Sequence, residues 1–175
     1  MKTLATGFEG LTLIEPQVFG DQRGYFFEPY NRERFKTHGL DFDFLQDNES
    51  FSKYGTLRGL HFQKGTFAQA KLVRVIEGAV WDVVVDLRNN SSTYRRWFGV
   101  ELTGENKKML MIPRGFAHGF VVTSPTALFS YKVDNIYSPQ NESGILWNDA
   151  TLNIDWKIPH ADVLLSEKDK KLPTI

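Results

Sequence analysis

The sequence contains no cysteine among its 175 residues. It therefore forms no disulfide, offers no thiol nucleophile and cannot bind zinc through thiolates. It also lacks any run approaching the roughly 20 apolar residues that a membrane-spanning helix needs. The first residues, MKTLATGFEG, lack the long apolar stretch of a signal peptide. We therefore expect a cytoplasmic protein and interpret the Asn-X-Ser triplets beginning at positions 48, 90 and 141 as chance matches to glycosylation acceptors.

An excess of either charge is also absent, because 21 lysines and arginines balance 21 aspartates and glutamates. General nucleic-acid binders usually carry a basic excess, so that class is disfavoured. A small anionic ligand is still compatible with the composition, since a few well-placed cations suffice to bind it. The length and the 41% hydrophobic content predict one domain over residues 1–175 with a sizeable core. We find no repeat, low-complexity tract or linker.

Short β-rich runs separated by turn signals fill most of the chain, which is typical of a β-sandwich or barrel. The run from Val80 to Leu87 is apolar on both faces, which suits a central strand between two layers. A short helix is expected at Arg32–His38, before Gly39, and a second at Ser166–Lys171, with Ser166 as its cap. The expected strands are Thr12–Glu15, Tyr25–Pro29, Phe44–Asn48, Leu57–Gln63, Lys71–Glu77, Ala79–Leu87, Phe98–Leu102, Met109–Ile112, Gly119–Val122 and Ala127–Val133.

Two strand-like segments are unusually rich in polar groups and are candidates for a ligand pocket. The first is Leu57–Gln63 followed by Lys71–Val75, and the second is Ile112–Phe120. Buried cations are costly unless they are paired, so a bound anion is one explanation. The alternative is that the two histidines, His61 and His118, are hydrogen-bonded interior or rim residues.

A metal site is disfavoured by the histidine spacing. Two histidines at positions i and i+2 of a strand face the same way, but the residue two after His61 is Gln63. The chain has four histidines, and His38 and His160 lie in unrelated contexts. A site made of histidines alone is therefore not expected, whereas a histidine–carboxylate site stays open.

Five segments, taken in order and spacing, resemble the dTDP-4-dehydrorhamnose 3,5-epimerase family. The resemblance extends from Gly20 to Asp169, and five matches in order are far more specific than any one of them. One departure is Glu49, where the family often has histidine, and we expect it to face away from the site. The segments are Gln46–Asn48, Leu57–Gln63, Lys71–Val75, Ile112–Phe120 and Gly144–Asp149.

The resemblance implies an all-β, antiparallel jelly roll of the cupin type with a few short helices. It also implies a homodimer, no metal, no cofactor and a deoxythymidine diphosphate sugar as substrate. In this family pattern His61 corresponds to the base and Asp169 to the carboxylate that orients it. Tyr131 corresponds to the acid on the opposite face of the sugar, and Lys71 to the residue beside the developing enolate.

The resemblance further implies a set of substrate-binding residues, in which Tyr137 stacks on the thymine ring. Each has an ordinary structural alternative, such as a surface ion pair for the arginines or a packed loop edge for Tyr137. Only the coincidence of all the motifs favours the functional interpretation. The set is Arg23, Phe26, Glu28, Gln46, Asp47, Asn48, Arg58, His118, Tyr137, Glu142 and Lys168.

The implied chemistry suits these residue types. A ketone at C4 acidifies the hydrogens on both C3 and C5, which lie on the same face of a gluco-configured chair, so one base can serve both carbons. Neutral histidine is such a base near pH 7, and an aspartate can fix its tautomer. Inversion needs an acid on the other face, a role that tyrosine can fill. No redox step occurs, and no dinucleotide-binding glycine motif is present.

Three functions remain open at this point: epimerisation at both carbons, a single-site epimerase or ketoisomerase on a related sugar, and a non-catalytic sugar-binding cupin. If the first is right, activity should survive exhaustive chelation without an added nucleotide. The resemblance, together with the bulky aromatic cluster at residues 25–27 that needs cover, implies that segment Asp21–Tyr30 packs across a subunit interface. Its residues Arg23, Phe26 and Glu28 would then lie near the partner's site. Arg58 and His61 differ by three positions, so both can face one site only if the strand carries a bulge, most naturally at Gly59.

Overall fold

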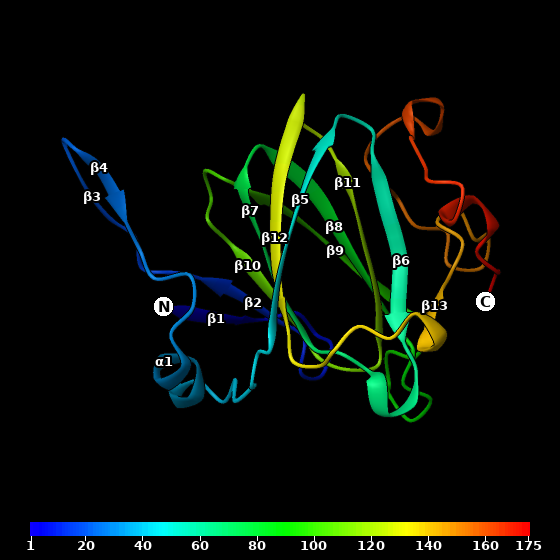
Figure 1. Ribbon diagram of the computed structural model, residues 1–175, viewed down its shortest axis with the longest axis horizontal. Coiled ribbons are helices and arrows are strands. Elements are labelled where there is room, and N and C mark those ends of the chain that lie inside the picture. The colour runs from blue at the N-terminus through cyan, green and yellow to red at the C-terminus, as the bar shows by residue number, and fades with distance from the viewer.

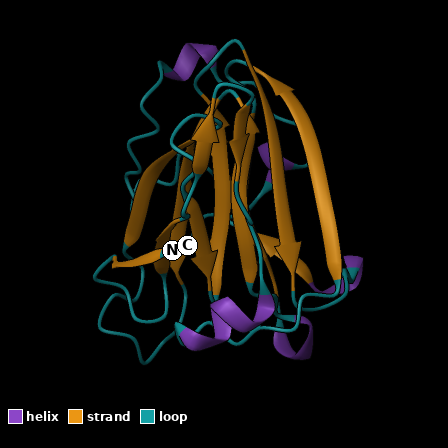
Figure 2. Ribbon diagram, turned by 90° about the vertical axis from the view of Figure 1, so that its left-hand side faces the viewer, coloured by secondary structure: helices purple, strands orange, loops and turns teal.

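Two antiparallel sheets, packed face to face, form the body of the protein. The computed structural model describes residues 1–175, with 43% of them in strands and 10% in helices, which confirms the predicted antiparallel β-sandwich. Figure 1 and Figure 2 show the two layers, with the short helical turns at their edges. None of the helices has the length and apolar character needed to cross a membrane.

The two sheets are built from segments that alternate along the chain. The first sheet has the order β1 (Lys2–Ala5), β2 (Thr12–Glu15), β10 (Met109–Ile112), β7 (Lys71–Glu77), β12 (Thr126–Val133) and β5 (Gln46–Lys53). The second has the order β13 (Glu142–Gly144), β6 (Leu57–Gln63), β11 (Phe116–Val122), β8 (Ala79–Asp86) and β9 (Trp97–Thr103).

The predicted strands are all present, with shifted bounds at β4, β5, β8, β9, β11 and β12. Strands β1, β3 and β13 were not predicted, because each has only three or four residues and little apolar alternation. Helix α1 (Arg32–Thr37) lies where it was expected, and the Asn31 side chain caps it by accepting a hydrogen bond from the Arg34 amide. The second expected helix shortens to the 3₁₀ turn η4 (Asp169–Lys171), whose Asp169 amide donates to the Ser166 hydroxyl.

Apolar residues form three separate clusters. One fills the space between the sheets and includes Val75, Val84 and Phe129. A second covers the outer face of the five-stranded sheet, where Trp147, Trp156 and neighbouring residues of the C-terminal segment pack on β6, β8 and β11. Strand β8 is therefore buried on both faces, as its apolar run predicted. In the third cluster, α1 and the segment after it cover part of the six-stranded sheet.

Strand β6 carries the predicted bulge. Its register with β11 pairs His61 with His118 and Arg58 with Phe120, so two residues of β6 lie opposite Gly119 alone. Gly59 adopts φ +132°, and a Cβ there would lie 2.5 Å from the Gly119 Cα. The bulge shifts the alternation of side chains by one residue. Arg58 and His61 therefore face the same side and both line one cavity.

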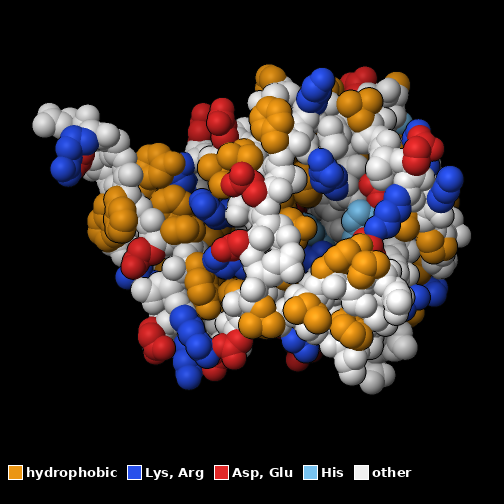
Figure 3. Space-filling view, viewed as in Figure 1, with side chains coloured by type: hydrophobic (Ala, Val, Ile, Leu, Met, Phe, Trp, Pro, Cys, Tyr) orange, Lys and Arg blue, Asp and Glu red, His pale blue; other side chains and the backbone are white.

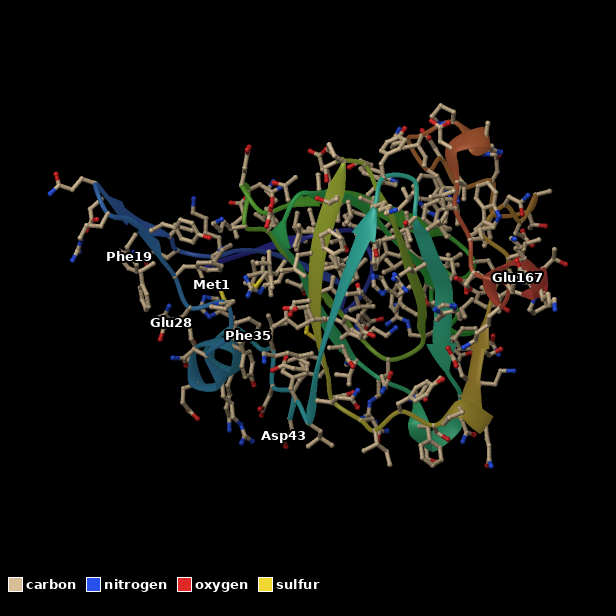
Figure 4. The ribbon with its side chains drawn as sticks, turned by 45° about the horizontal axis from the view of Figure 1, so that its top comes forward. Met1, Phe19, Glu28, Phe35, Asp43 and Glu167 are labelled. Atoms are coloured by element: carbon tan, nitrogen blue, oxygen red, sulfur yellow. The ribbon has the colours of Figure 1, made fainter.

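A hairpin of β3 (Phe19–Asp21) and β4 (Gly24–Phe26) projects from the body as an arm (Figure 1). Figure 4 shows labelled Phe19 on this arm and Glu167 of the C-terminal segment at opposite ends of the molecule. The aromatic side chains of the arm are exposed, and Phe26 reaches 66%. The expected strand Tyr25–Pro29 is thus replaced by the shorter β4, whose aromatic side chains stay mostly exposed within one chain.

Candidate active site

A cavity of about 680 Å³ opens between the two sheets and the C-terminal segment. Figure 3 shows this hollow on the right half of the molecule, with histidine inside it and lysine and arginine around its rim. The sheet alternation directs polar side chains of β5, β7 and β12 towards β6 and β11. The predicted site residues that line it are Asn48, Arg58, His61, Lys71, His118, Tyr131, Lys168 and Asp169.

His61 is paired with Asp169, which lies 108 residues further along the chain. The His61 Nε2 lies 2.6 Å from the Asp169 Oδ1, and the aspartate side chain is 5% exposed. An ionised carboxylate only accepts hydrogen bonds, so we assign the proton to Nε2, which leaves Nδ1 as the free base. Burial lowers the pKa of His61 below its usual range, although Asp169 opposes the shift. The imidazole is therefore neutral near pH 7 and able to accept a proton.

A second histidine–aspartate pair lies beside Lys71. The His118 Nε2 lies 2.9 Å from the Oδ2 of Asp82, which is fully buried, and the other carboxylate oxygen has no hydrogen-bond partner. Burial raises the pKa of Asp82, against the effect of His118 and Lys71. Burial also lowers the pKa of Lys71 to about 8, despite Asp82 and Glu142. Lys71 is therefore a cation that can lose its charge at mildly alkaline pH.

Tyr131 reaches the same cavity from β12, packed against Phe129. Burial raises the pKa of Tyr131, while the Arg58 guanidinium opposes the shift. The phenol therefore keeps its proton near neutrality. Arg58 itself donates from Nε to the Ser52 hydroxyl, 3.2 Å away. The cavity thus combines a neutral imidazole, a protonated phenol and a lysine, which together can remove and return protons.

Beside the cavity, Glu142 accepts hydrogen bonds from two predicted site residues, Tyr137 and Lys168, of which only Lys168 lines the cavity itself. The Tyr137 hydroxyl and the Lys168 Nζ each lie 2.5 Å from its Oε2. Burial pushes the pKa of Glu142 up, but the hydrogen bonds from Lys168 and Tyr137 outweigh it and hold the pKa below the usual range. The three side chains join the loop after β12, strand β13 and the segment before η4 into one rim.

Comparison with known proteins assigns the chain to a family. The family model for dTDP-4-dehydrorhamnose 3,5-epimerase matches residues 5–175. A relative of that name from Escherichia coli is 48% identical, and the match covers 100% of this chain and 95% of the relative. The chain belongs to the dTDP-4-dehydrorhamnose 3,5-epimerase family. Its members are isomerases, and the cavity is the candidate active site of this epimerase.

Solved structures agree with this assignment. The epimerase from Elizabethkingia anophelis is 56% identical with a TM-score of 0.95, covering 99% of this chain and 96% of its own. The enzyme RmlC from Legionella pneumophila, solved in complex with dTDP-4-keto-L-rhamnose, is 44% identical with a TM-score of 0.94. That match covers 99% of this chain and 92% of the Legionella chain. The cupin-like fold implied by the sequence motifs is thus shared with these epimerases.

Some predicted site residues of this epimerase lie away from the cavity of their own chain. Asp47 is on the outer face of the first sheet, where it forms an ion pair with Lys132. Gln46 lies at the beginning of β5 and donates to the Asn48 side chain. Glu49, expected to face away, borders both the cavity and a smaller pocket on the other side of the sheet.

The three residues that were expected to contact substrate from segment Asp21–Tyr30 are also remote from the cavity. Arg23 pairs with Asp21 within the hairpin, and Glu28 pairs with Arg34 of α1. Phe26 is exposed at the end of β4, opposite Phe19 and away from the turn of the hairpin. Within one chain none of the three lines the cavity, so their predicted contact with substrate needs a second subunit.

Sequence reasoning missed Asp82 as a site residue of the epimerase. The signal was present, because Asp82 is one of two carboxylates, with Asp86, in a mostly apolar run on a strand that was expected to be buried. A buried charge needs a partner, and here that partner is His118. No group of three or more His, Asp or Glu side chains is arranged to hold a metal ion.

Proposed function

We propose that this epimerase inverts C3 and C5 of dTDP-4-dehydro-6-deoxy-D-glucose and yields dTDP-4-dehydro-L-rhamnose, a step of dTDP-sugar biosynthesis. The observation that carries the proposal is the His61–Asp169 pair at 2.6 Å in the same cavity as Tyr131 and Lys71. Inversion needs a base on one face of the sugar and an acid on the other. Burial keeps the His61 imidazole neutral and the Tyr131 phenol protonated, so the two side chains meet this requirement.

In the proposed mechanism His61 Nδ1 takes the proton from C3 or C5. The electron pair of the broken C–H bond moves to the C4 oxygen and forms an enolate. Asp169 keeps the imidazole in the required tautomer and stabilises the imidazolium. Tyr131 then donates its phenolic proton to the opposite face of the carbon, which completes the inversion. Water takes the proton from the imidazolium and returns one to the tyrosinate before the second carbon reacts.

Lys71 is proposed to stabilise the enolate oxygen. Its ammonium is charged below its pKa of about 8, and its burial strengthens its interaction with a developing negative charge. The buried Asp82–His118 pair next to it supplies a compensating carboxylate, which makes the buried cation tolerable. Arg58, Lys168, Asn48, His118, Glu142 and Tyr137 are proposed to bind the nucleotide and the sugar.

We further propose a homodimer in which the arm of one subunit reaches the cavity of the other. The support is the exposure of its aromatic residues and the absence of Arg23, Phe26 and Glu28 from the cavity of their own chain. An arm of this kind is stable as an extended element only if a partner covers it.

Solvent deuterium exchange tests the proposed function. The substrate is incubated with the enzyme in D₂O, and incorporation at each carbon is followed by NMR. Exchange at both C3 and C5 is expected. Exchange at one carbon alone would identify a single-site enzyme, and no exchange at all would favour a non-catalytic sugar-binding protein.

A further inference from the structure

Gln63, the last residue of β6, uses its whole side-chain amide to hold two loops. It is only 7% exposed. Its Nε2 donates to the carbonyl oxygens of Phe67 and Ile136, at 2.9 and 3.0 Å. Its Oε1 accepts from the amide of Ser138 at 2.6 Å. Both donor hydrogens and the acceptor are therefore in use, and the reversed amide would place an oxygen against two carbonyls.

Two of these three bonds bracket Tyr137. Ile136 precedes it and Ser138 follows it, so one side chain fixes the backbone on both sides of the tyrosine. The Tyr137 side chain is 51% exposed, and its hydroxyl bonds to Glu142. The ring is thus held from a fixed backbone beside the cavity, because its partner Glu142 also bonds to Lys168, which lines the cavity.

A second set of hydrogen bonds holds the beginning of the loop that carries Tyr137, without involving Tyr137 itself. The Asn135 Nδ2 donates to the Thr66 carbonyl at 2.8 Å, and the Gln69 Nε2 donates to the Asn135 carbonyl at 2.8 Å. These bonds connect the loop to the segment around η1 (Gly65–Phe67), away from the strand that carries His61. Gln63 is the residue of β6 whose side chain bonds directly to both flanks of Tyr137.

We propose that Gln63 is the positioning residue for the base-binding tyrosine, and that it links the nucleotide-binding loop to the strand of the catalytic base. This rests on the proposed function in that Tyr137 stacks on the base of the nucleotide. Because Gln63 lies two residues after His61, it faces the same side of β6. The ring is pre-organised at a fixed distance from the imidazole, so less ordering is needed when the nucleotide binds.

The test combines Gln63→Met, which keeps the length of the side chain and removes its hydrogen bonds, with Tyr137→Ala. Gln63→Met should raise the KM for the dTDP-sugar and the Kd for dTDP about tenfold, and change kcat by less than about twofold, because the loss falls on binding. In the Tyr137→Ala background the same substitution should change the Kd by less than about twofold, since the ring it positions is gone. Gln69→Met is the control and should leave both constants unchanged.

A purely structural role predicts a different pattern. It would lower kcat or stability equally in both backgrounds, and that result would overturn the proposal. Circular dichroism and the thermal midpoint are measured on every variant, and Gln63→Asn replaces Gln63→Met in the cycle if the latter does not fold. If Tyr137→Ala binds dTDP as tightly as wild type, the stacking role is wrong. If Tyr137→Ala raises the Kd for dTDP but the Gln63 variant does not, Tyr137 binds the nucleotide and Gln63 does not position it.

Discussion

His61 holds one hydrogen bond, to Asp169, and keeps its other nitrogen free. Replacing it with alanine should abolish deuterium incorporation at both C3 and C5, because one base serves both carbons. A general base contributes roughly 10²–10⁴-fold, so the loss should be at least of that size. The matched control is His38→Ala, since His38 is exposed on the helix end and bonds only locally. Wild-type exchange at either carbon in His61→Ala would show that another group is the base.

Tyr131 offers a change that separates the two proton transfers. Tyr131→Phe keeps the ring and removes the proton donor, so abstraction should persist while inversion is impaired. The ratio of deuterium incorporation to product formation should therefore rise above that of wild type, as measured by NMR and product analysis. Tyr54→Phe is the control, because its hydroxyl bonds to Asp162 on the surface. An unchanged ratio with normal product formation would exclude Tyr131 as the acid.

The pKa shifts of His61 and Lys71 define the expected pH profile. His61 must be neutral to accept a proton, and burial lowers its pKa below 6.5, so activity should fall only at pH values below that number. Lys71 must be protonated to stabilise the enolate, and its pKa is about 8, so activity should fall as the pH rises through about 8. The profile of kcat/KM is the measurement. Lys71→Gln should remove the alkaline decline, and a decline in wild type only near pH 10 would contradict the role.

The family resemblance supplied the candidate site residues, and eight of them line the cavity, but the residues that contact them were only partly predictable. The residue pattern alone left a ligand pocket and ordinary interior histidines open for His61 and His118, and the family resemblance favoured the pocket that both side chains line. Asp82 was missed because its partner is on another strand, and strand pairing is not visible in one sequence. Asp47 was expected at the site but faces outward, because it precedes Asn48, which lines the cavity, and neighbouring residues of a strand face opposite sides.

At the scale of elements, the bulge in β6 decides the geometry of the site. Gly59→Ala would place a Cβ 2.5 Å from the Gly119 Cα and 2.8 Å from the His118 carbonyl, both backbone atoms, at a φ that disfavours side chains. We expect a loss of more than about 3 kcal/mol of stability, with loss of activity, because the backbone of β11 cannot move away cheaply. Urea unfolding is the measurement.

Gly65→Ala is the matched control for this change. Gly65 also has positive φ, at +59°, but a Cβ there would meet nothing within 4 Å. Only the backbone strain remains, about 1–2 kcal/mol. Equal losses for the two variants would show that the bulge contributes no more than an ordinary turn.

The bulge was the one irregular feature that the sequence predicted, since Arg58 and His61 could share a site only if the strand lost its regular phase. The arm was harder to define, because a hairpin of three-residue strands has little periodicity to detect. The covering role of residues 145–175 was also hidden, because long segments without regular structure leave no pattern in sequence.

At the scale of the whole molecule, the exposed arm predicts assembly. Phe26→Asp should weaken the proposed dimer and lower activity together, because a charge replaces an aromatic ring at the interface and the arm residues leave the partner's cavity. Analytical ultracentrifugation and turnover on the same samples are the measurements. Tyr94→Asp serves as the control, since Tyr94 is also exposed but lies after β8, outside the arm. A wild-type monomer with full activity at assay concentrations would rule the arm out as a site component.

The 108-residue separation between His61 and Asp169 also orders events during synthesis of the chain. A ribosome adds roughly 5–20 residues per second, so the imidazole exists for on the order of 5–20 s before its carboxylate is made. Partial chains can bury Val84 and Phe129 between the two sheets, yet none that stops before residue 169 holds the oriented base. The newly synthesised chain therefore gains an oriented catalytic base only after almost all of its residues have been made.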